Sequence, residues 1–186
     1  MNHYLDIHLL PDQEVSAAQL MSALFSKLHH VLVRRNGDIG ISFPDVDEAR
    51  PWLGERLRLH GVQASLQELL TQSWLSGIRD HVRLGQATPV PAGALYRTIR
   101  RVQAKSNAER LRRRQMRRHD LTPAEAALRI PVSVERHLEL PYVTLQSGSN
   151  AQRFHLFIQH GLIREEVEIG RFTSYGLSNG ATVPWF

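Results

Sequence analysis

The N-terminal half of the chain alternates between strand-like and helix-like hydrophobic patterns. Residues 3–10, HYLDIHLL, predict a strand. Apolar residues then recur at helical spacing from Leu20 to Leu32. Ser16 followed by Gln19 has the sequence of a capping box, in which two side chains satisfy free backbone N–H groups at a helix start. A helix is therefore predicted to begin after Ser16.

The same alternation continues to about residue 85. A second capping pair, Ser65 with Glu68, predicts a helix that runs through about Ile78. Further strands are predicted at residues 39–43, 55–60 and 81–85. The order strand, helix, strand, strand, helix, strand is that of the ferredoxin-like unit, which serves many functions, so the order alone decides none.

Residues 85–94, rich in proline, glycine and alanine, predict a linker between two domains, 1–94 and 95–186. In the second domain residues 96–104 look extended. Capping pairs predict helix starts at Ser106 with Glu109 and at Thr122 with Glu125. A hairpin is predicted from residues 142–147 and 154–160. The expected fold class is α+β: a ferredoxin-like βαββαβ domain, then an α+β domain that carries an arginine-rich helix.

Composition narrows the function. The chain has 186 residues, a formal net charge of +5 and no cysteine, which excludes disulfides, thiolate zinc sites and a cysteine nucleophile. No apolar run approaches the ~18 residues of a membrane span, and MNHYLDIHLL has no signal-peptide pattern. We therefore expect a cytoplasmic protein with no membrane partner. The basic balance favours a polyanionic partner.

The segment 106–120, SNAERLRRRQMRRHD, concentrates this charge, with six arginines between Arg110 and Arg118. At 100° per residue five of them fall within an arc of ~140°, and Arg112 lies on the other side. These five are Arg110, Arg113, Arg114, Arg117 and Arg118. Arginine grips phosphates bidentately, so the helix favours nucleic acid over a merely solvated face. A membrane-surface helix would need more apolar residues opposite the charges. The helix alone does not separate DNA from RNA.

Just upstream, Arg101 and Gln103 share one side of an extended segment. Arginine matches the guanine O6/N7 edge and glutamine the adenine N6/N7 edge. The pair predicts either base reading or an ordinary exposed strand face.

The sequence also allows chemistry on RNA. Asp45, Asp47 and Glu48 cluster in a predicted loop and are more typical of a turn than of a metal site, so we expect no metal and no cofactor. Metal-free cleavage would use the RNA 2′-hydroxyl, with a neutral histidine as base. Helix phase places His29 at the edge of the apolar stripe and His30 nearly opposite. An edge histidine either faces a cleft or is a partly buried rim residue.

Several of these segments resemble one family. The stretches HYLDI, KLHH, RVQAKSNAERLRRRQMRRHDL, YVTLQSGS, FHLFIQHG and YGLSNG…VPWF are similar, in order and over nearly the whole chain, to the CRISPR RNA-processing endoribonuclease of type I-F systems. The resemblance implies cleavage of the precursor transcript at the base of each repeat stem-loop, without metal. It also implies that the product stays bound and that the protein joins the other subunits of the interference complex.

The resemblance further implies roles for single residues. His29 would be the general base, Ser147 would hold the attacked ribose, and Tyr175 would orient the histidine. Phe154 would stack on the closing base pair. The RNA-binding set would be Arg101, Gln103, Lys105, Arg110, Arg113, Arg114, Arg117, Arg118, Ser149 and Phe154. Within this set Arg101, Gln103 and Arg114 would read the major groove, and Arg113, Arg117 and Arg118 would grip phosphates.

Two of these roles compete with plainer interpretations. Ser147 and Ser149 lie in LQSGSN, where serines are typical of a turn. Phe154 alternates with core-like Leu156 and Ile158, so it can stack on RNA only at the exposed end of its strand. For the whole protein, two further hypotheses stay open at this point: a non-catalytic RNA-binding subunit, and a DNA-binding protein with a basic helix.

Overall fold

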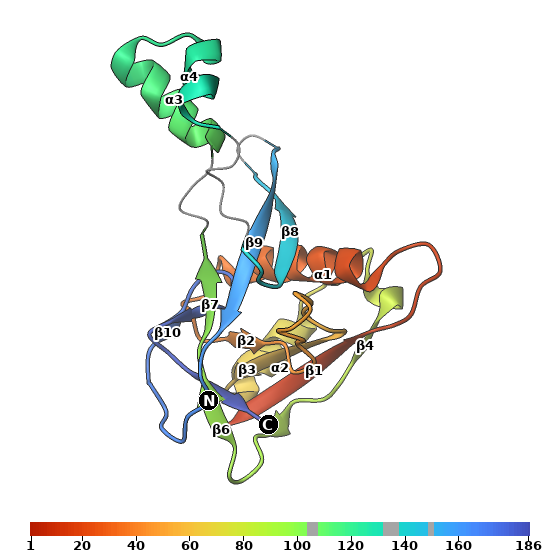
Figure 1. The fold of residues 1–186 in the computed structure, drawn as a ribbon. Coiled ribbons are helices and arrows are strands. Elements are labelled where there is room, and N and C mark those ends of the chain that lie inside the picture. Colours follow the sequence, from red (N-terminus) through yellow and green to blue (C-terminus); the bar gives the residue numbers. More distant parts are fainter. Residues whose placement is uncertain (104–107, 132–137, 149–150) are drawn as a thin grey trace. The chain divides into compact units, whose positions relative to one another are not determined.

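The structure is a computed structural model that describes residues 1–103, 108–131, 138–148 and 151–186 (Figure 1). The chain forms two compact units. Unit 1 comprises Met1–Arg101 and Leu140–Phe186, and unit 2 comprises Val102–Glu139. Helices and antiparallel sheets together confirm the α+β class. The division into domains after residue 94 stays a prediction.

The predicted element order is present in the first part of unit 1. The elements are β1 (His3–Leu9), α1 (Ala17–Leu32), β2 (Gly40–Ser42), β3 (Arg56–Gly61), α2 (Gln63–Thr71), the 3-10 turn η1 (Arg79–His81) and β4 (Val82–Leu84). The strands form an antiparallel sheet in the order β2-β3-β1-β4. In Figure 1 α1 and α2 lie along this sheet.

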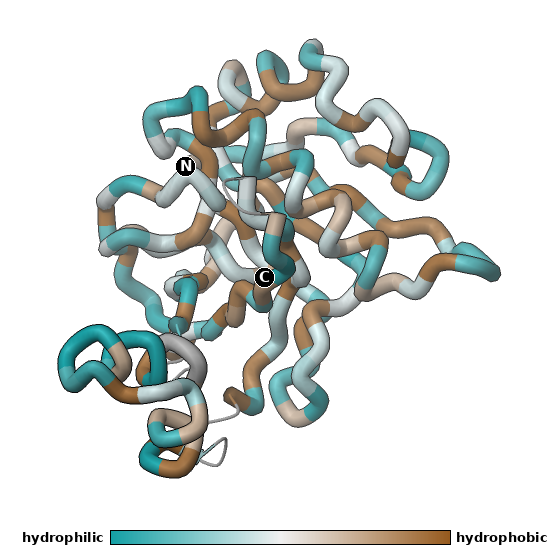
Figure 2. The backbone as a smooth tube through the Cα atoms, turned by 90° about the horizontal axis from the view of Figure 1, so that it is seen from above, coloured by the Kyte–Doolittle hydropathy of each residue, from teal (hydrophilic) through white to brown (hydrophobic). Residues whose placement is uncertain are grey.

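Alternation along β1 builds the core. Leu5 and Ile7 face Leu59 and Leu57 across the β1–β3 ladder, and all four are fully buried. The apolar stripe of α1 is buried in the same core, at Leu20, Met21, Leu24, Phe25, Leu28 and Leu32. The capping box at Ser16 and Gln19 forms as predicted. Figure 2 shows the resulting alternation of hydrophobic and hydrophilic stretches along the backbone.

The second capping-box prediction is wrong. Helix α2 begins at Gln63, after Val62, without a side-chain cap, and it ends at Thr71. The helix thus starts two residues before Ser65, which cannot be its N-cap. Glu68, the other residue of the expected pair, pairs instead with Arg35 at 3.1 Å.

The remainder of unit 1 consists mainly of strands, of which β9 is the longest. They are β5 (Thr88–Pro89), β6 (Leu95–Arg97), β7 (Ile99–Val102), β8 (Tyr142–Gln146), β9 (Arg153–His160), β10 (Arg171–Phe172), β11 (Ser178–Asn179) and β12 (Val183–Trp185). The predicted linker contains β5, which pairs with β1, and the extended segment 96–104 contains part of β6 and all of β7. The β8–β9 hairpin is confirmed, and it belongs to a sheet in the order β7-β9-β8.

Unit 2 contains α3 (Ala108–His119) and α4 (Pro123–Arg129). The capping box of Thr122 and Glu125 forms as predicted, and Asp120, with φ of 50°, follows α3. The capping pair predicted at Ser106 lies outside the described residues. Within the described ranges no helix is long and apolar enough to cross a bilayer.

Candidate active site

His29 lies in the last turn of α1, half-buried, and its ring is held by a backbone group. Its Nδ1 lies 2.9 Å from the carbonyl oxygen of Ser174. Because a carbonyl only accepts hydrogen bonds, Nδ1 must carry the proton and donate it. The neutral imidazole then has its lone pair on Nε2. The site therefore presents a proton acceptor of fixed tautomer.

The ring plane of His29 is fixed by Tyr175. The two rings stack with centroids 3.9 Å apart and an interplanar angle of 13°. Tyr175 also stacks on Phe25, at 6.1 Å, and Phe25 on Phe43, at 6.4 Å. This column of aromatic rings extends from the core to the histidine. A buried aromatic scaffold therefore fixes the orientation of the imidazole.

A tight turn positions Ser174 and Tyr175. The amide of Gly176 donates to the carbonyl of Thr173 at 2.8 Å, and its carbonyl accepts from the amide of Ile41 at 2.9 Å. Gly176 has φ of 71°, and a Cβ there would come within 2.7 Å of the Ile41 side chain. The turn thus needs glycine, both for its backbone angle and for its close approach to β2.

The pKa of His29 is lowered from its ordinary value. Burial is the main cause, because it disfavours the imidazolium, and the neighbouring His30 lowers the pKa further. The hydrogen bond to Ser174 partly opposes them. His29 is therefore neutral at pH 7, the form that a general base requires. His30 is exposed, as helix phase predicted.

Arg101 lies close to two aromatic rings, those of Tyr175 and Phe154. The exposed guanidinium of Arg101 is 5.7 Å from the ring centroid of Tyr175 and 5.9 Å from that of Phe154. Phe154 is half-buried, and it is the second residue of β9. Its side chain packs against the core from the second position of the strand. Its stacking on RNA stays a prediction.

Ser147 lies in the turn that joins β8 and β9, half-buried. Its amide donates to the Gln152 carbonyl at 2.8 Å, and its carbonyl accepts from the amide of Ala151 at 3.0 Å. The backbone of Ser147 is thus part of the turn, as its sequence context suggested. Ser149 lies outside the described residues. Gln103 is exposed, immediately after β7.

The arginine-rich helix is α3 of unit 2. Four arginines of the predicted face are exposed: Arg113, Arg114, Arg117 and Arg118. Arg112 lies on the other side, as predicted, and its Nε donates to the carbonyl of Ile130 at 2.8 Å. This bond reaches the C-cap of α4, so Arg112 links the two helices. Lys105 and the side chain of Arg110 lie outside the described residues.

The acidic residues of the 45–48 loop have structural partners. Asp45 pairs with Arg56 at 2.6 Å and Glu48 with Arg97 at 2.8 Å. Asp47 accepts hydrogen bonds from the amides of Ala49 and Arg50, which is turn chemistry. In the part of the chain that the structure describes, no three His, Asp or Glu side chains are grouped so that they could hold a metal ion.

Sequence reasoning missed the carbonyl of Ser174. A backbone acceptor leaves no mark on residue identity, and residues 29 and 174 are far apart in the chain. The one local signal was the Tyr175-Gly176 pair, which is typical of a turn. The contacts of Arg101 with the two aromatic rings were also not predicted.

Comparison with known proteins identifies the family of the chain. The model of a family of CRISPR-associated proteins, Cas_Csy4, matches residues 4–186. A Pseudomonas aeruginosa protein named CRISPR-associated endonuclease Cas6/Csy4 is 58% identical, with 100% of both chains covered. An Escherichia coli protein of the same name is 47% identical, again with 100% of both chains covered. A family match over nearly the full length, with these identities, shows that the chain belongs to the Csy4 family of CRISPR-associated proteins.

Proposed function

We propose that this protein is a metal-independent endoribonuclease that cuts CRISPR precursor RNA at the base of the repeat stem-loop. The observation that supports it best is His29, a neutral imidazole with Nδ1 bonded to Ser174 and Nε2 available as a base. The names of the two relatives support endonuclease activity. The products would be a 2′,3′-cyclic phosphate and a 5′-hydroxyl.

In the proposed reaction Nε2 of His29 accepts the proton of the ribose 2′-hydroxyl. The 2′-oxygen attacks the adjacent phosphorus, the bond from phosphorus to the 5′-oxygen breaks, and that oxygen takes up a proton. The His29 ring, stacked at 3.9 Å on Tyr175, needs no reorientation for this step. Ser147 would hold the attacked ribose.

RNA recognition would be shared by the two units. Arg101 and Gln103 would read bases in the stem, with Arg114 contributing from α3, and Phe154 would stack on the closing pair. Arg113, Arg117 and Arg118 would neutralise phosphates, and each contact of this kind steepens the salt dependence of binding. We further propose that the product stays bound, that other interference-complex subunits are partners, and that the protein acts in the cytoplasm.

The direct test is incubation of the protein with a labelled repeat stem-loop in EDTA. The proposal predicts one cut at the stem base and a 3′ product end that resists phosphatase until acid opens the cyclic phosphate. Tight binding without cleavage, also after magnesium is added, would favour the non-catalytic RNA-binding hypothesis. Binding of duplex DNA as tight as that of the stem-loop would instead favour the DNA-binding hypothesis.

The first prediction concerns pH. Because the base must be neutral, the cleavage rate should rise with pH through the pKa of His29, which lies below 6.5, and be level at pH 7. His30→Ala removes a neighbour that lowers this pKa, so its rate profile should shift to higher pH with the plateau kept. Single-turnover rates from pH 5 to 8 measure both. A lost plateau in His30→Ala would mean that His30 takes part in the chemistry.

The second prediction separates base reading from phosphate contact. Arg101→Ala should weaken binding of the cognate stem-loop by about 1–3 kcal/mol and relax sequence preference. Arg117→Ala should weaken all stem-loops alike and lower the slope of log Kd against log salt by about one. Arg83→Ala, which removes an exposed arginine on β4, is the control. Identical effects of Arg101→Ala and Arg117→Ala on every RNA would reject this division.

A further inference from the structure

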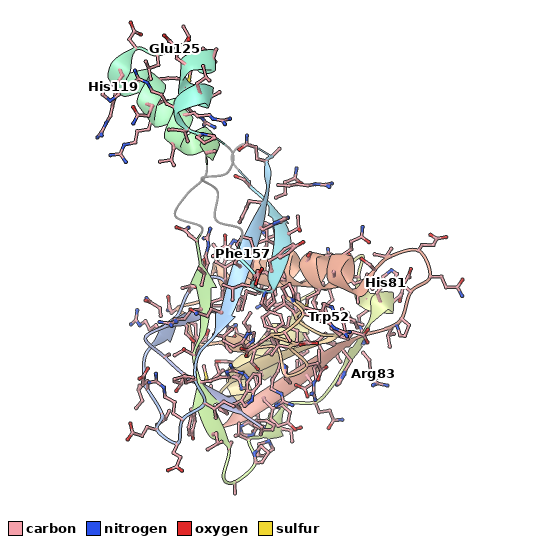
Figure 3. The ribbon with its side chains drawn as sticks, in the orientation of Figure 1. Trp52, His81, Arg83, His119, Glu125 and Phe157 are labelled. Atoms are coloured by element: carbon pink, nitrogen blue, oxygen red, sulfur yellow. The ribbon has the colours of Figure 1, made fainter. Side chains whose placement is uncertain are left out.

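The outer face of the β8–β9 hairpin carries two exposed rings, Tyr142 and His155, and the half-buried ring of Phe157. The register sets Tyr142 opposite Phe157, Thr144 opposite His155 and Gln146 opposite Arg153, while the alternate positions are buried except for the half-buried Phe154. The Tyr142 ring, in a residue 42% exposed, stacks on His155 at 4.1 Å and meets the edge of Phe157 at 5.6 Å. Figure 3 labels Phe157 on this hairpin. Folding does not require such a cluster on the surface.

A polar groove adjoins this face. It lies between α1 and the hairpin, and its lining residues are Ala18, Gln19, Ser22, Ala23, Ser26, Thr144, Leu145, Gln146 and Arg153. Besides three apolar residues, the lining consists of hydroxyl and amide side chains and one guanidinium, and none of these residues is acidic. The amide of Thr144 donates to Ser22 Oγ at 3.0 Å, which fixes the hairpin against the helix. The groove is therefore a pre-formed surface suited to an anion.

The groove leads along α1 toward His29. Ser22 lines the groove, and His29 follows it by seven residues on the same helix. Seven residues turn an α-helix by two turns to within about 20°, and they advance it by about 10 Å. The candidate base thus lies on the same helix face as the groove, two turns further on.

We propose that this hairpin face and groove bind the single-stranded RNA that flanks the repeat hairpin next to the cut. The inference rests on the proposed function and adds a second RNA contact to it. Aromatic rings stack on any base, and a nearby arginine pairs with the phosphates, so the combination suits single strands without sequence preference. The positive charge of Arg153 and the lack of acidic residues in the groove lining favour RNA, because RNA carries negative phosphates. A protein partner would require only the aromatic patch.

The test uses three RNAs with a 2′-deoxy nucleotide at the cut, so that binding is measured without cleavage. One is the bare stem-loop, and the others carry a single-stranded flank of about ten nucleotides on the 5′ or the 3′ side. Arg153→Ala/His155→Ala changes only exposed side chains, and Arg83→Ala is the matched control. The double variant should bind one of the two flanked RNAs about tenfold more weakly than the wild type does, and it should bind the bare stem-loop as tightly as the wild type does. The RNA affected identifies the bound flank.

A second readout does not depend on affinity. A 4-thiouridine in the bound flank should crosslink the wild-type protein to a peptide that contains β9. The inference would be overturned if the double variant and the control bound each of the three RNAs equally well and the wild type gave no such crosslink. A protein partner would then be the remaining candidate for this face. Equal weakening on the bare stem-loop would also overturn it. In either case the wild type still binds the stem-loop, so the proposed function survives, whereas failure of the wild type to bind any of the RNAs would remove both.

Discussion

Replacing His29 by alanine is expected to slow cleavage by about 10²–10⁴-fold, the usual contribution of a general base, and to leave stem-loop binding nearly unchanged. The imidazole is the one side chain of the described site that has a fixed tautomer, a lowered pKa and an available acceptor nitrogen. Its removal leaves Tyr175, Arg101 and the arginine-rich helix in place. Single-turnover cleavage and equilibrium binding on the same RNA would separate the two effects.

His30→Ala is the matched control for that experiment, because it removes the adjacent histidine from the same helical turn. We expect it to cleave at the wild-type plateau rate. An equally large loss of rate in both variants, or a large loss of affinity in His29→Ala, would contradict the assignment of His29 as the base.

Acid should destabilise the fold well above the pH at which its carboxylates titrate. Burial, with a smaller contribution from a nearby arginine in each case, lowers the pKa of His60 to about 3 and that of His160 to about 4. His60 Nδ1 and both ring nitrogens of His160 are buried and have no hydrogen-bond partner among the residues that the structure describes. These two rings are therefore held in the neutral form.

The sign of the effect follows from linkage. Above the unfolded pKa of 6.5 both rings are neutral in both states, so the stability that they contribute is fully present. Below pH 6.5 the two histidines bind protons in the unfolded chain but not in the folded chain. The free energy of unfolding therefore falls as the pH falls toward 4. Between pH 6.5 and 4.5 each ring should account for about 2 kcal/mol. Urea unfolding at both pH values measures the loss.

His160→Phe tests the origin of that loss. The ring of His160 lies among Phe43 and Trp185, at 6.2 and 5.9 Å, so phenylalanine should be tolerated. The variant should lose about half of the acid sensitivity and keep its stability at pH 7. The same drop in stability for His160→Phe as for the wild type would show that other groups cause the acid effect.

The predictions made from the sequence were correct where the structural feature depends on residues that are close together in the chain. The capping boxes at Ser16 and Thr122 formed because helix and cap lie within four residues. The pair of Ser65 and Glu68 does not form a capping box, because the helix begins two residues before Ser65, and Glu68 pairs with Arg35, which is distant in sequence. Period-two alternation correctly predicted which residues of β9 face the core. For Phe154 the period alone was not enough, because its proposed role also depends on its position near the end of the strand.

The candidate site was predictable only in part. Helix phase correctly separated the half-buried His29 from the exposed His30, and it placed Arg112 opposite the other arginines. The carbonyl of Ser174 sets the histidine tautomer, and the Gly176 turn against β2 positions that carbonyl. Both depend on tertiary packing, which no spacing within α1 reveals.

The most direct test of the account is cleavage of a stem-loop with a single 2′-deoxy nucleotide on the 5′ side of the cut. The change removes the nucleophile and leaves the rest of the RNA and the protein intact. The account predicts tight binding and no cleavage, in EDTA or in magnesium, whereas the all-RNA stem-loop is cut in both. Cleavage of the deoxy substrate at a comparable rate would show that water or another group attacks the phosphorus, and the role assigned to His29 would be wrong.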